Sequence, residues 1–255
     1  MSQEQTGGML KVAIIGMGKL GGSIAKLLHQ KDVKTYPLRR NDPLVDADLY
    51  YLTVPDKSLL EVANKIPIGK IILHASGAND HLLLRPHYPV GVLHPIMTFP
   101  GIDVGIPSPP IPAGIRGDPE AIQQAKSLCQ LLGFQAFEFN GDASIYHSAA
   151  VIAGNFSTIL MHIAADLLAS QGIPKDHAMQ YVMPLAIESV KNAAKGSLKE
   201  TLSGPLARQD HVTIEKHLES FKGFPKHIER AYSSMTQVGS MYLAWEKRKI
   251  KQKKY

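Results

Sequence analysis

Glycines at a fixed spacing near the N-terminus are the residues best suited to bind a charged ligand. Gly16, Gly18 and Gly21 form a Gly-x-Gly-x-x-Gly pattern that follows the apolar run 10–15 and opens a helical pattern over 19–30. In this context the first glycine permits a tight turn, the second lets backbone approach a pyrophosphate, and the third lets helix and strand pack closely. The helix N-terminus offers N–H groups and partial positive charge to phosphate. The pattern predicts a dinucleotide site; a glycine turn without a ligand is the alternative.

The end of the second predicted strand indicates which dinucleotide the site binds. NAD-binding folds carry an acidic residue there, about 20 residues after the glycines, that hydrogen-bonds the ribose hydroxyls. This sequence reads Arg39-Arg40-Asn41 instead, and two guanidinium groups suit the 2′-phosphate of NADP(H). NADP(H) is therefore favoured over NAD, with two solvated surface arginines as the alternative. The expected cofactor-binding residues are Gly16, Met17, Gly18, Lys19, Leu20, Gly21, Arg39, Arg40, Thr53, Val54 and Pro55.

Histidines end two neighbouring predicted strands, where ligands bind in open α/β sheets. His74 stands shortly before Ser76, and His94 stands before Pro95. A histidine can protonate a carbonyl oxygen or an imine nitrogen as hydride arrives, because its pKa lies near neutral pH. A hydrogen-bonded structural role is the alternative for each. We predict that His94 is catalytic and that His74 and Ser76 bind substrate.

Three further candidates lie in the second half of the chain. His147 and Asn155 are eight residues apart, so on one helix they project within about 80° of each other and one face can present both. Arg208 lies in the polar, turn-rich segment 203–210 and could bind a substrate carboxylate bidentately; an ion pair with Asp210 is the alternative. We predict that His147 and Asn155 are catalytic and that Arg208 binds substrate. No cluster of histidines and cysteines has metal-ligand spacing, so no metal site is predicted.

The elements that position these residues differ between the two halves. Before residue 141, apolar runs of strand length alternate with helical patterns, which predicts a parallel α/β sheet. After it, helical patterns continue without strand signals. The predicted architecture is a Rossmann-type dinucleotide-binding domain over 1–141, followed by an all-helical substrate and dimerisation domain over 142–255. The segment 41–48 is too short for a helical crossover, which needs about a dozen residues. One strand and one helix of the doubly wound fold are therefore expected to be missing.

The bounds of the expected elements follow from periodicity and from turn residues. Asp118 is the expected cap of a helix that has Pro119 in its first turn. The expected strands are 10–15, 35–39, 49–54, 71–74, 90–94 and 134–139, and the expected helices are 19–30, 57–64, 118–132, 142–171, 175–195, 214–222 and 225–249.

Composition and charge limit the environment and the partners. Of the 255 residues, 44% are hydrophobic and 20% are charged, which is typical of globular proteins. The segment Glu246–Tyr255 holds six basic residues and one acidic residue, a net +5 of the formal +6. Such a tail can contact nucleic acid or an acidic membrane, but a solvated terminus is favoured, so neither partner is predicted. Cys129 is the single cysteine and is expected to be buried.

The N-terminal residues and the lengths of the apolar runs indicate in which cellular compartment the protein is expected. Residues 1–8 lack the basic start and apolar stretch of a signal peptide. No run in the sequence approaches the roughly 18 apolar residues of a transmembrane helix. A cytoplasmic location is therefore expected.

Taken together, the motifs resemble those of a known family. The chain is similar to uncharacterised Rossmann-like NADP-binding proteins whose C-terminal half is domain of unknown function 2520. The layout is also similar to that of pyrroline-5-carboxylate reductase, ketopantoate reductase and prephenate dehydrogenase, with a helical half of the 6-phosphogluconate dehydrogenase C-terminal type. The resemblance implies NADP-linked hydride transfer and homodimers built through the helical domain. The segments that carry it are Gly16–Gly21, Thr53–Asp56, His74–Ala78, Gly91–Pro95 with Phe99, Tyr146–Phe156 and Ser203–Asp210.

Departures from these relatives leave the substrate open. Val151 stands four residues before Asn155, where ketopantoate reductase-like enzymes carry a lysine, and the Pro-Gly-Thr loop of pyrroline-5-carboxylate reductase is absent. The expected function is an NADP(H)-dependent oxidoreductase that transfers hydride to or from a small carbonyl or imine acid. The alternative is a non-catalytic NADP(H)-binding or sensor protein. An S-adenosylmethionine enzyme is disfavoured, because a carboxylate usually holds its ribose diol and this chain has Arg39 and Arg40 there.

Overall fold

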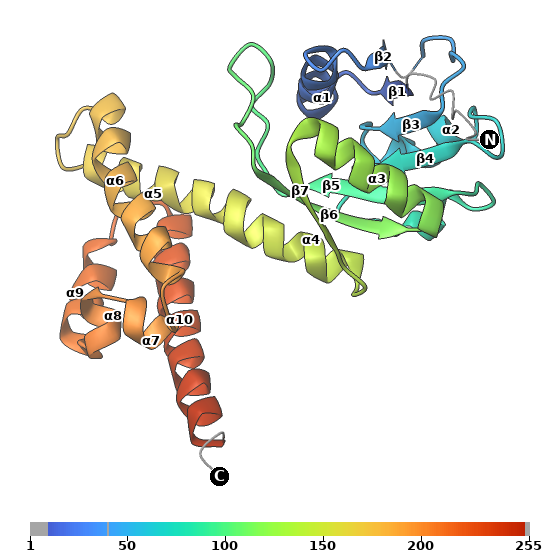
Figure 1. Cartoon of the computed structure of the whole chain (residues 1–255). Helices are drawn as coiled ribbons and strands as arrows, with labels where there is room; N and C mark the ends of the chain where they lie inside the picture. The colour runs from blue at the N-terminus through green and yellow to red at the C-terminus, as the bar shows by residue number, and fades with distance from the viewer. Residues whose placement is uncertain (1–9, 40, 253–255) are drawn as a thin grey trace. The chain divides into compact units, whose positions relative to one another are not determined.

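The computed structural model describes residues 10–39 and 41–252, with side chains up to residue 249. The chain forms two compact units, residues 1–154 and 155–255. Each unit has its own architecture (Figure 1).

The first unit is built on a seven-stranded sheet with the order β2-β1-β3-β4-β5-β6-β7. Neighbouring strands are parallel except for β5 and β6, which are antiparallel. In the described residues no strand lies beyond β2, so the sheet ends one strand short of the full doubly wound fold, as expected. The strands are β1 (Lys11–Ile15), β2 (Lys34–Leu38), β3 (Leu49–Leu52), β4 (Ile71–His74), β5 (Val90–Pro95), β6 (Ile111–Gly117) and β7 (Phe134–Glu138).

Helices cover both faces of this sheet (Figure 1). On one face α1 (Lys19–His29) and α3 (Pro119–Leu132) pack against alternate strand residues, and on the other α2 (Leu59–Ala63) does so together with short 3-10 turns. Strands buried on both faces read as continuous apolar runs, which is why β1, β3 and β4 are recognisable in the sequence. The 3-10 turns are η1 (Asp56–Ser58) and η2 (His81–Leu84).

The far edge of the sheet differs from the expectation. Strand β6 was not expected, because Pro112, Gly114 and Gly117 weaken its strand signal. Its antiparallel pairing makes the sheet mixed at this edge. Asp118 occupies the N-cap position of α3, but its carboxylate makes no cap bond. The expected cap position is thus confirmed, but the side-chain capping bond is absent, because that carboxylate accepts instead from the Arg85 guanidinium at 2.9 and 2.6 Å and from the Val90 amide at 2.8 Å.

A long helix joins the two units. It consists of α4 (Ala143–Val151), a π-helical segment η3 (Ile152–Phe156) and α5 (Ser157–Ala169). The carboxylate of Asp142 caps it by accepting the amides of Ser144 and Ile145. The helix therefore begins where the second domain was expected to begin, whereas the compact units divide inside it.

By length and composition the continuous helix Ala143–Ala169 is apolar enough to cross a membrane. This corrects the expectation that no run approaches that length. Core helices of soluble proteins, which are mostly buried, pass the same test, whereas only 6% of this apolar window is buried within the chain. The helix also carries the polar side chains of His147, Asn155 and Asp166.

In the second unit the described residues form helices and no strand, as expected. The buried apolar side chains among its described residues are few: Ala165, Ala178, Ile214, Phe221 and Ile228. The segment 203–210 was expected to be a loop, but it contains a short helix with proline in its first turn, too short for a periodic signal. After α5 the helices are α6 (Lys175–Ala193), α7 (Leu198–Thr201), α8 (Gly204–Arg208), α9 (His211–Ser220) and α10 (Lys226–Gln252).

Candidate active site

Most of the residues predicted to bind the cofactor line one cavity. The cavity has a volume of about 610 Å³, and its lining is Gly16, Met17, Gly18, Arg39, Thr53, Val54 and Pro55. Lys19 and Leu20 open helix α1 directly behind it, and Gly18 is the N-cap. No side chain caps this helix, and no acidic residue stands in its first turn. Its first N–H groups are therefore available to a phosphate.

Each glycine of the pattern has a distinct steric role. Gly16 has φ 111°, and a Cβ there would lie 2.8 Å from the carbonyl of Thr53. A Cβ on Gly21 would overlap the carbonyl oxygen of Gly16. Thr53 fixes the same turn by donating its hydroxyl to that oxygen at 2.6 Å. Around Gly18, in contrast, nothing lies within 4 Å of a Cβ. The backbone at Gly18 is therefore open to a ligand, and the cradle fits a dinucleotide pyrophosphate.

Arg39 also lines this cavity, directly after β2, and its side chain is exposed. Its backbone amide donates to a carboxylate oxygen of Asp42 at 2.7 Å. This bond fixes the backbone that carries the guanidinium. Arg40 lies outside the described residues, so its predicted role has no structural counterpart here.

Two of the predicted catalytic residues meet at the carboxyl edge of the sheet. His94 stands near the end of β5 and His147 stands on α4; their ring centroids are 5.7 Å apart and their planes are 76° apart. Gly77, which follows β4, lies between the rings. A Cβ there would be 2.8 Å from His147 Nδ1 and 2.9 Å from His94 Cε1. The two rings therefore close around a position that only glycine can occupy without displacing them.

Burial and the neighbouring histidine both affect the charge of His94. Burial, and to a smaller extent the nearby His147, lower the pKa of His94 to about 4. His94 is therefore neutral at neutral pH, with one ring nitrogen donating and the other accepting. Nδ1 of His147 is buried and has no hydrogen-bond partner within the described part of the chain.

Two aromatic side chains that were not predicted from the sequence, Tyr146 and Phe139, support this pair. Tyr146 Oη lies 2.9 Å from His94 Nδ1, and the two rings meet edge to face. The other side of Tyr146 stacks on Phe139, with centroids 4.1 Å apart and planes 8° apart. In the sequence, Tyr146 stands next to His147 at the start of a predicted helix, and this position could have indicated its role.

The two predicted substrate-binding residues of the sheet edge lie deeper than the histidine pair. His74 is fully buried, and burial lowers its pKa to about 4. Ser76 is also buried, and its Oγ accepts from the side-chain amide of Asn79 at 2.9 Å. The same amide donates to Asp56 at 2.9 Å. In this structure the amide of Asn79 thus links Ser76 to the exposed carboxylate of Asp56. Contact of His74 or Ser76 with substrate stays a prediction.

The remaining predicted residues belong to the second unit. Asn155 is exposed in the π-helical segment, and Arg208 is exposed at the end of α8. The carboxylate of Asp210 caps α9 by accepting from the amide of Thr213 at 3.0 Å and from its hydroxyl at 2.7 Å. Among the described residues no ion pair joins Arg208 to Asp210. The described ranges also hold no group of three or more metal-binding side chains.

Comparison with protein families identifies the second half of the chain. The family model of a domain of unknown function, DUF2520, matches residues 111–238, half of the chain. The chain belongs to the DUF2520 family. The match begins at β6 and extends into α10. A search of curated proteins found no match.

Solved structures share the fold along nearly the whole chain. A Bacteroides fragilis protein provisionally named an NADP oxidoreductase has a TM-score of 0.76 at 22% identity, covering 91% of this chain and 98% of that one. A Thermotoga maritima protein has a TM-score of 0.69 at 17% identity, covering 92% and 99%. The pyrroline carboxylate reductase of Plasmodium falciparum, solved with NADP bound, has a TM-score of 0.59 at 15% identity, covering 91% and 100%. At these identities the likeness establishes an α/β Rossmann-like fold with a helical C-terminal region.

Proposed function

We propose that this DUF2520 protein is an NADP(H)-dependent oxidoreductase that transfers hydride to or from a small carbonyl or imine acid. One observation carries the proposal: the glycine cavity and the His94–His147 pair lie at the same carboxyl edge of the sheet. In open α/β sheets this edge binds ligands. The similar fold of a reductase solved with NADP bound supports the same choice.

The proposed roles of the residues follow from their chemistry. The backbone at Gly18 and the N-terminus of α1 bind the pyrophosphate, and Arg39 binds the 2′-phosphate. When bound, NADPH supplies the hydride. His94 and His147, the proposed catalytic residues, hydrogen-bond the carbonyl oxygen or imine nitrogen that becomes electron-rich.

Residues of the second unit complete this proposal. Asn155 is proposed to orient the substrate, and Arg208 is proposed to bind its carboxylate. The carboxylate of Asp210 is engaged at the cap of α9, and within the described part of the chain no ion pair holds the Arg208 guanidinium to it. The proposed location is the cytoplasm, where the buried thiol of Cys129 stays reduced; burial raises its pKa to about 12.

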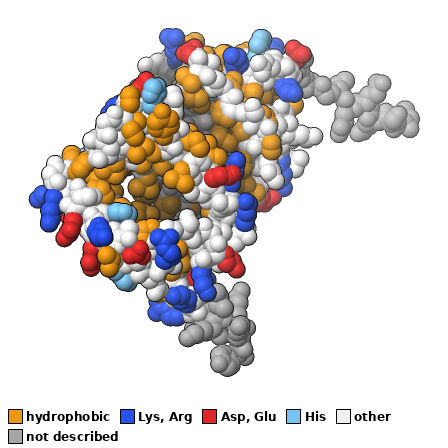
Figure 2. Space-filling model, turned by 90° about the vertical axis from the view of Figure 1, so that its left-hand side faces the viewer, with side chains coloured by type: hydrophobic (Ala, Val, Ile, Leu, Met, Phe, Trp, Pro, Cys, Tyr) orange, Lys and Arg blue, Asp and Glu red, His pale blue; other side chains and the backbone are white. Residues whose placement is uncertain are grey.

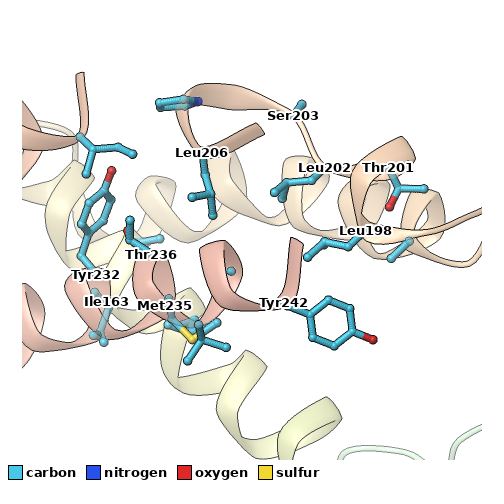
Figure 3. A pocket seen from close by; sticks show the side chains of 18 of the residues that line it. Ile163, Leu198, Thr201, Leu202, Ser203, Leu206, Tyr232, Met235, Thr236 and Tyr242 are labelled. Atoms are coloured by element: carbon cyan, nitrogen blue, oxygen red, sulfur yellow. The ribbon is translucent and has the colours of Figure 1, made fainter. Parts of the chain in front are cut away.

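We also propose a homodimer that forms through the helical unit. A cavity of about 810 Å³ among α5, α7, α8 and α10 has a mainly apolar lining, including Ile163, Leu206 and Met235 (Figure 3). Hydrophobic side chains also gather broadly on the face seen in Figure 2. On α6 Tyr181, Leu185 and others stay exposed. A unit with so few buried side chains needs apolar cover, which a second copy would supply.

Turnover on a panel of small keto acids and cyclic imines tests the enzymatic proposal. We expect NADPH oxidation with at least one substrate, lost in the His94→Ala, His147→Ala double variant while NADPH still binds. Retained turnover in that variant would remove both histidines from the mechanism. NADPH binding without turnover on any substrate would favour a non-catalytic sensor.

A further inference from the structure

The phenol of Tyr146 fits into a gap in the sheet next to His94. Strands β5 and β6 pair His94 with Gly114. A Cβ on Gly114 would overlap the Tyr146 hydroxyl and lie 2.8 Å from its Cζ. Phe139 stacks on the phenol ring from the other side. Three elements thus hold the Tyr146 hydroxyl in one place, against the imidazole of His94.

The direction of the hydrogen bond follows from the protonation of the two groups. Burial raises the pKa of Tyr146 to about 12, so its hydroxyl keeps its single hydrogen. Two acceptors are within reach: Nδ1 of His94 at 2.9 Å and the carbonyl oxygen of His94 at 3.4 Å. The shorter contact is at the usual length of a hydrogen bond, whereas the longer one is at its limit. If Nδ1 carried the hydrogen, it would donate to the phenol oxygen, and the hydroxyl would be left with only the longer contact to the carbonyl. The difference in length therefore favours donation of the hydroxyl to Nδ1.

A neutral imidazole that accepts at Nδ1 carries its hydrogen on Nε2. Nε2 of His94 faces the gap beside Gly77, because a Cβ there would lie 3.0 Å from it. His147 borders the same gap, where a Cβ would lie 2.8 Å from its Nδ1. The N–H of His94 thus points to the side where the histidine pair meets.

We propose that Tyr146 is a positioning residue that fixes His94 in the tautomer with its hydrogen on Nε2, so that His94 presents a hydrogen-bond donor to the substrate. The consequence for chemistry rests on the proposed function. In that reaction His94 polarises the carbonyl or imine as an electrophile, and it does not act as the base. The tautomer itself is a property of the protein without cofactor or substrate.

Nitrogen NMR of histidine-labelled protein, without cofactor, tests the proposal. The His94 signals are assigned by their loss in His94→Gln. We expect the shift of Nδ1 to be that of an unprotonated nitrogen and the shift of Nε2 to be that of an N–H. The reverse assignment, with hydrogen on Nδ1, would overturn the proposal.

Tyr146→Phe separates the hydroxyl from the packing of the ring, since phenylalanine can keep the stack on Phe139. In this variant we expect the Nδ1 shift of His94 to move toward the protonated value, because the donor that selects the tautomer is gone. Tyr88→Phe is the matched control. It removes a hydroxyl that donates to Glu120 at 2.8 Å, near the opposite end of β5, and should leave the His94 signals unchanged. Wild-type His94 shifts in Tyr146→Phe would show that the tyrosine does not set the tautomer.

Kinetics add a second readout where a substrate is known. Tyr146→Phe should lower kcat roughly tenfold and leave the Kd for NADPH unchanged, because the hydroxyl contacts His94 and not the glycine cavity. An unchanged kcat together with an altered tautomer would show that His94 does not act as the electrophile, whereas Tyr146 would still be the residue that sets its tautomer. Absence of any turnover in the wild type would count against the proposed function alone, since the NMR result does not depend on it.

Discussion

Gly77→Ala places one methyl group between the two histidine rings. The new Cβ would lie 2.8 Å from His147 Nδ1, 2.9 Å from His94 Cε1 and 3.0 Å from His94 Nε2. Ordinary contact begins near 3.4 Å, so the ring of His147 must move by about half an ångström and that of His94 by nearly as much. Overpacking of this kind costs about 1–3 kcal/mol of stability.

The effect on catalysis is larger than the effect on binding. A misplacement of about 1 Å can lower a rate on the order of 100-fold, so half of that predicts a loss in kcat of roughly tenfold. The Kd for NADPH should not change, because Gly77 is not among the residues that line the glycine cavity. Urea unfolding measures the loss of stability, steady-state kinetics measure kcat, and nucleotide fluorescence measures the Kd for NADPH.

Gly141→Ala is the control for this experiment. Nothing lies within 4 Å of a Cβ at Gly141, and its backbone does not need positive φ. We expect wild-type stability and kcat in this variant. If Gly77→Ala has the same stability and kcat as Gly141→Ala, the two histidine rings do not close around residue 77.

Three further predictions follow from charges and exposed surfaces. Arg39→Ser should weaken NADPH binding roughly 10- to 100-fold, the usual value of a charged hydrogen bond, with little effect on NADH; equal losses for both nucleotides in a fluorescence titration would exclude a contact with the 2′-phosphate. The folded pKa values of His74 and His94, about 4, lie below the ordinary value of 6.5, so the native state takes up fewer protons than the unfolded state. Stability should therefore be complete above pH 6.5 and fall toward pH 4, by up to about 3 kcal/mol per histidine; urea unfolding of His94→Gln should show a weaker pH dependence, and an unchanged one would contradict the assignment. Leu185→Glu should shift the mass in sedimentation toward the monomer, whereas Ile68→Glu on the first unit, equally exposed, should not; a dimer that survives Leu185→Glu would place the interface elsewhere.

Local patterns predicted the tight glycine turn after β1, whereas its role in cofactor binding stays a prediction. The glycine spacing indicates a tight turn, a close approach of the backbone to a ligand and close packing of helix against strand. All three involve residues that are near one another in the sequence, so the motif can be recognised without knowledge of distant contacts. The apolar runs of β1 and β4 are recognisable for the same reason, because both faces of each strand are buried. Arg39 could be placed because it directly follows β2.

Pairings between distant segments could not be predicted in this way. The contact of Tyr146 with His94 depends on β6, whose proline and glycines conceal it in the sequence. Asp118 looked like a helix cap, but Arg85, far away in the sequence, supplies a stronger partner for its carboxylate. His74 and His94 look alike in the sequence, because each stands at the end of a strand. Only the structure shows that His74 is fully buried and that His94 lies beside His147.

Titration of the purified protein with NADPH and, separately, with NADH tests the central claim most directly. Wild-type protein should bind NADPH tightly and NADH weakly, as measured by nucleotide fluorescence. Gly18→Val, which fills the open space at the N-terminus of α1, should lose NADPH binding while it keeps its fold by circular dichroism. Absence of binding of either nucleotide to the wild type, or full binding to Gly18→Val, would contradict the assignment of the glycine cavity as a dinucleotide site.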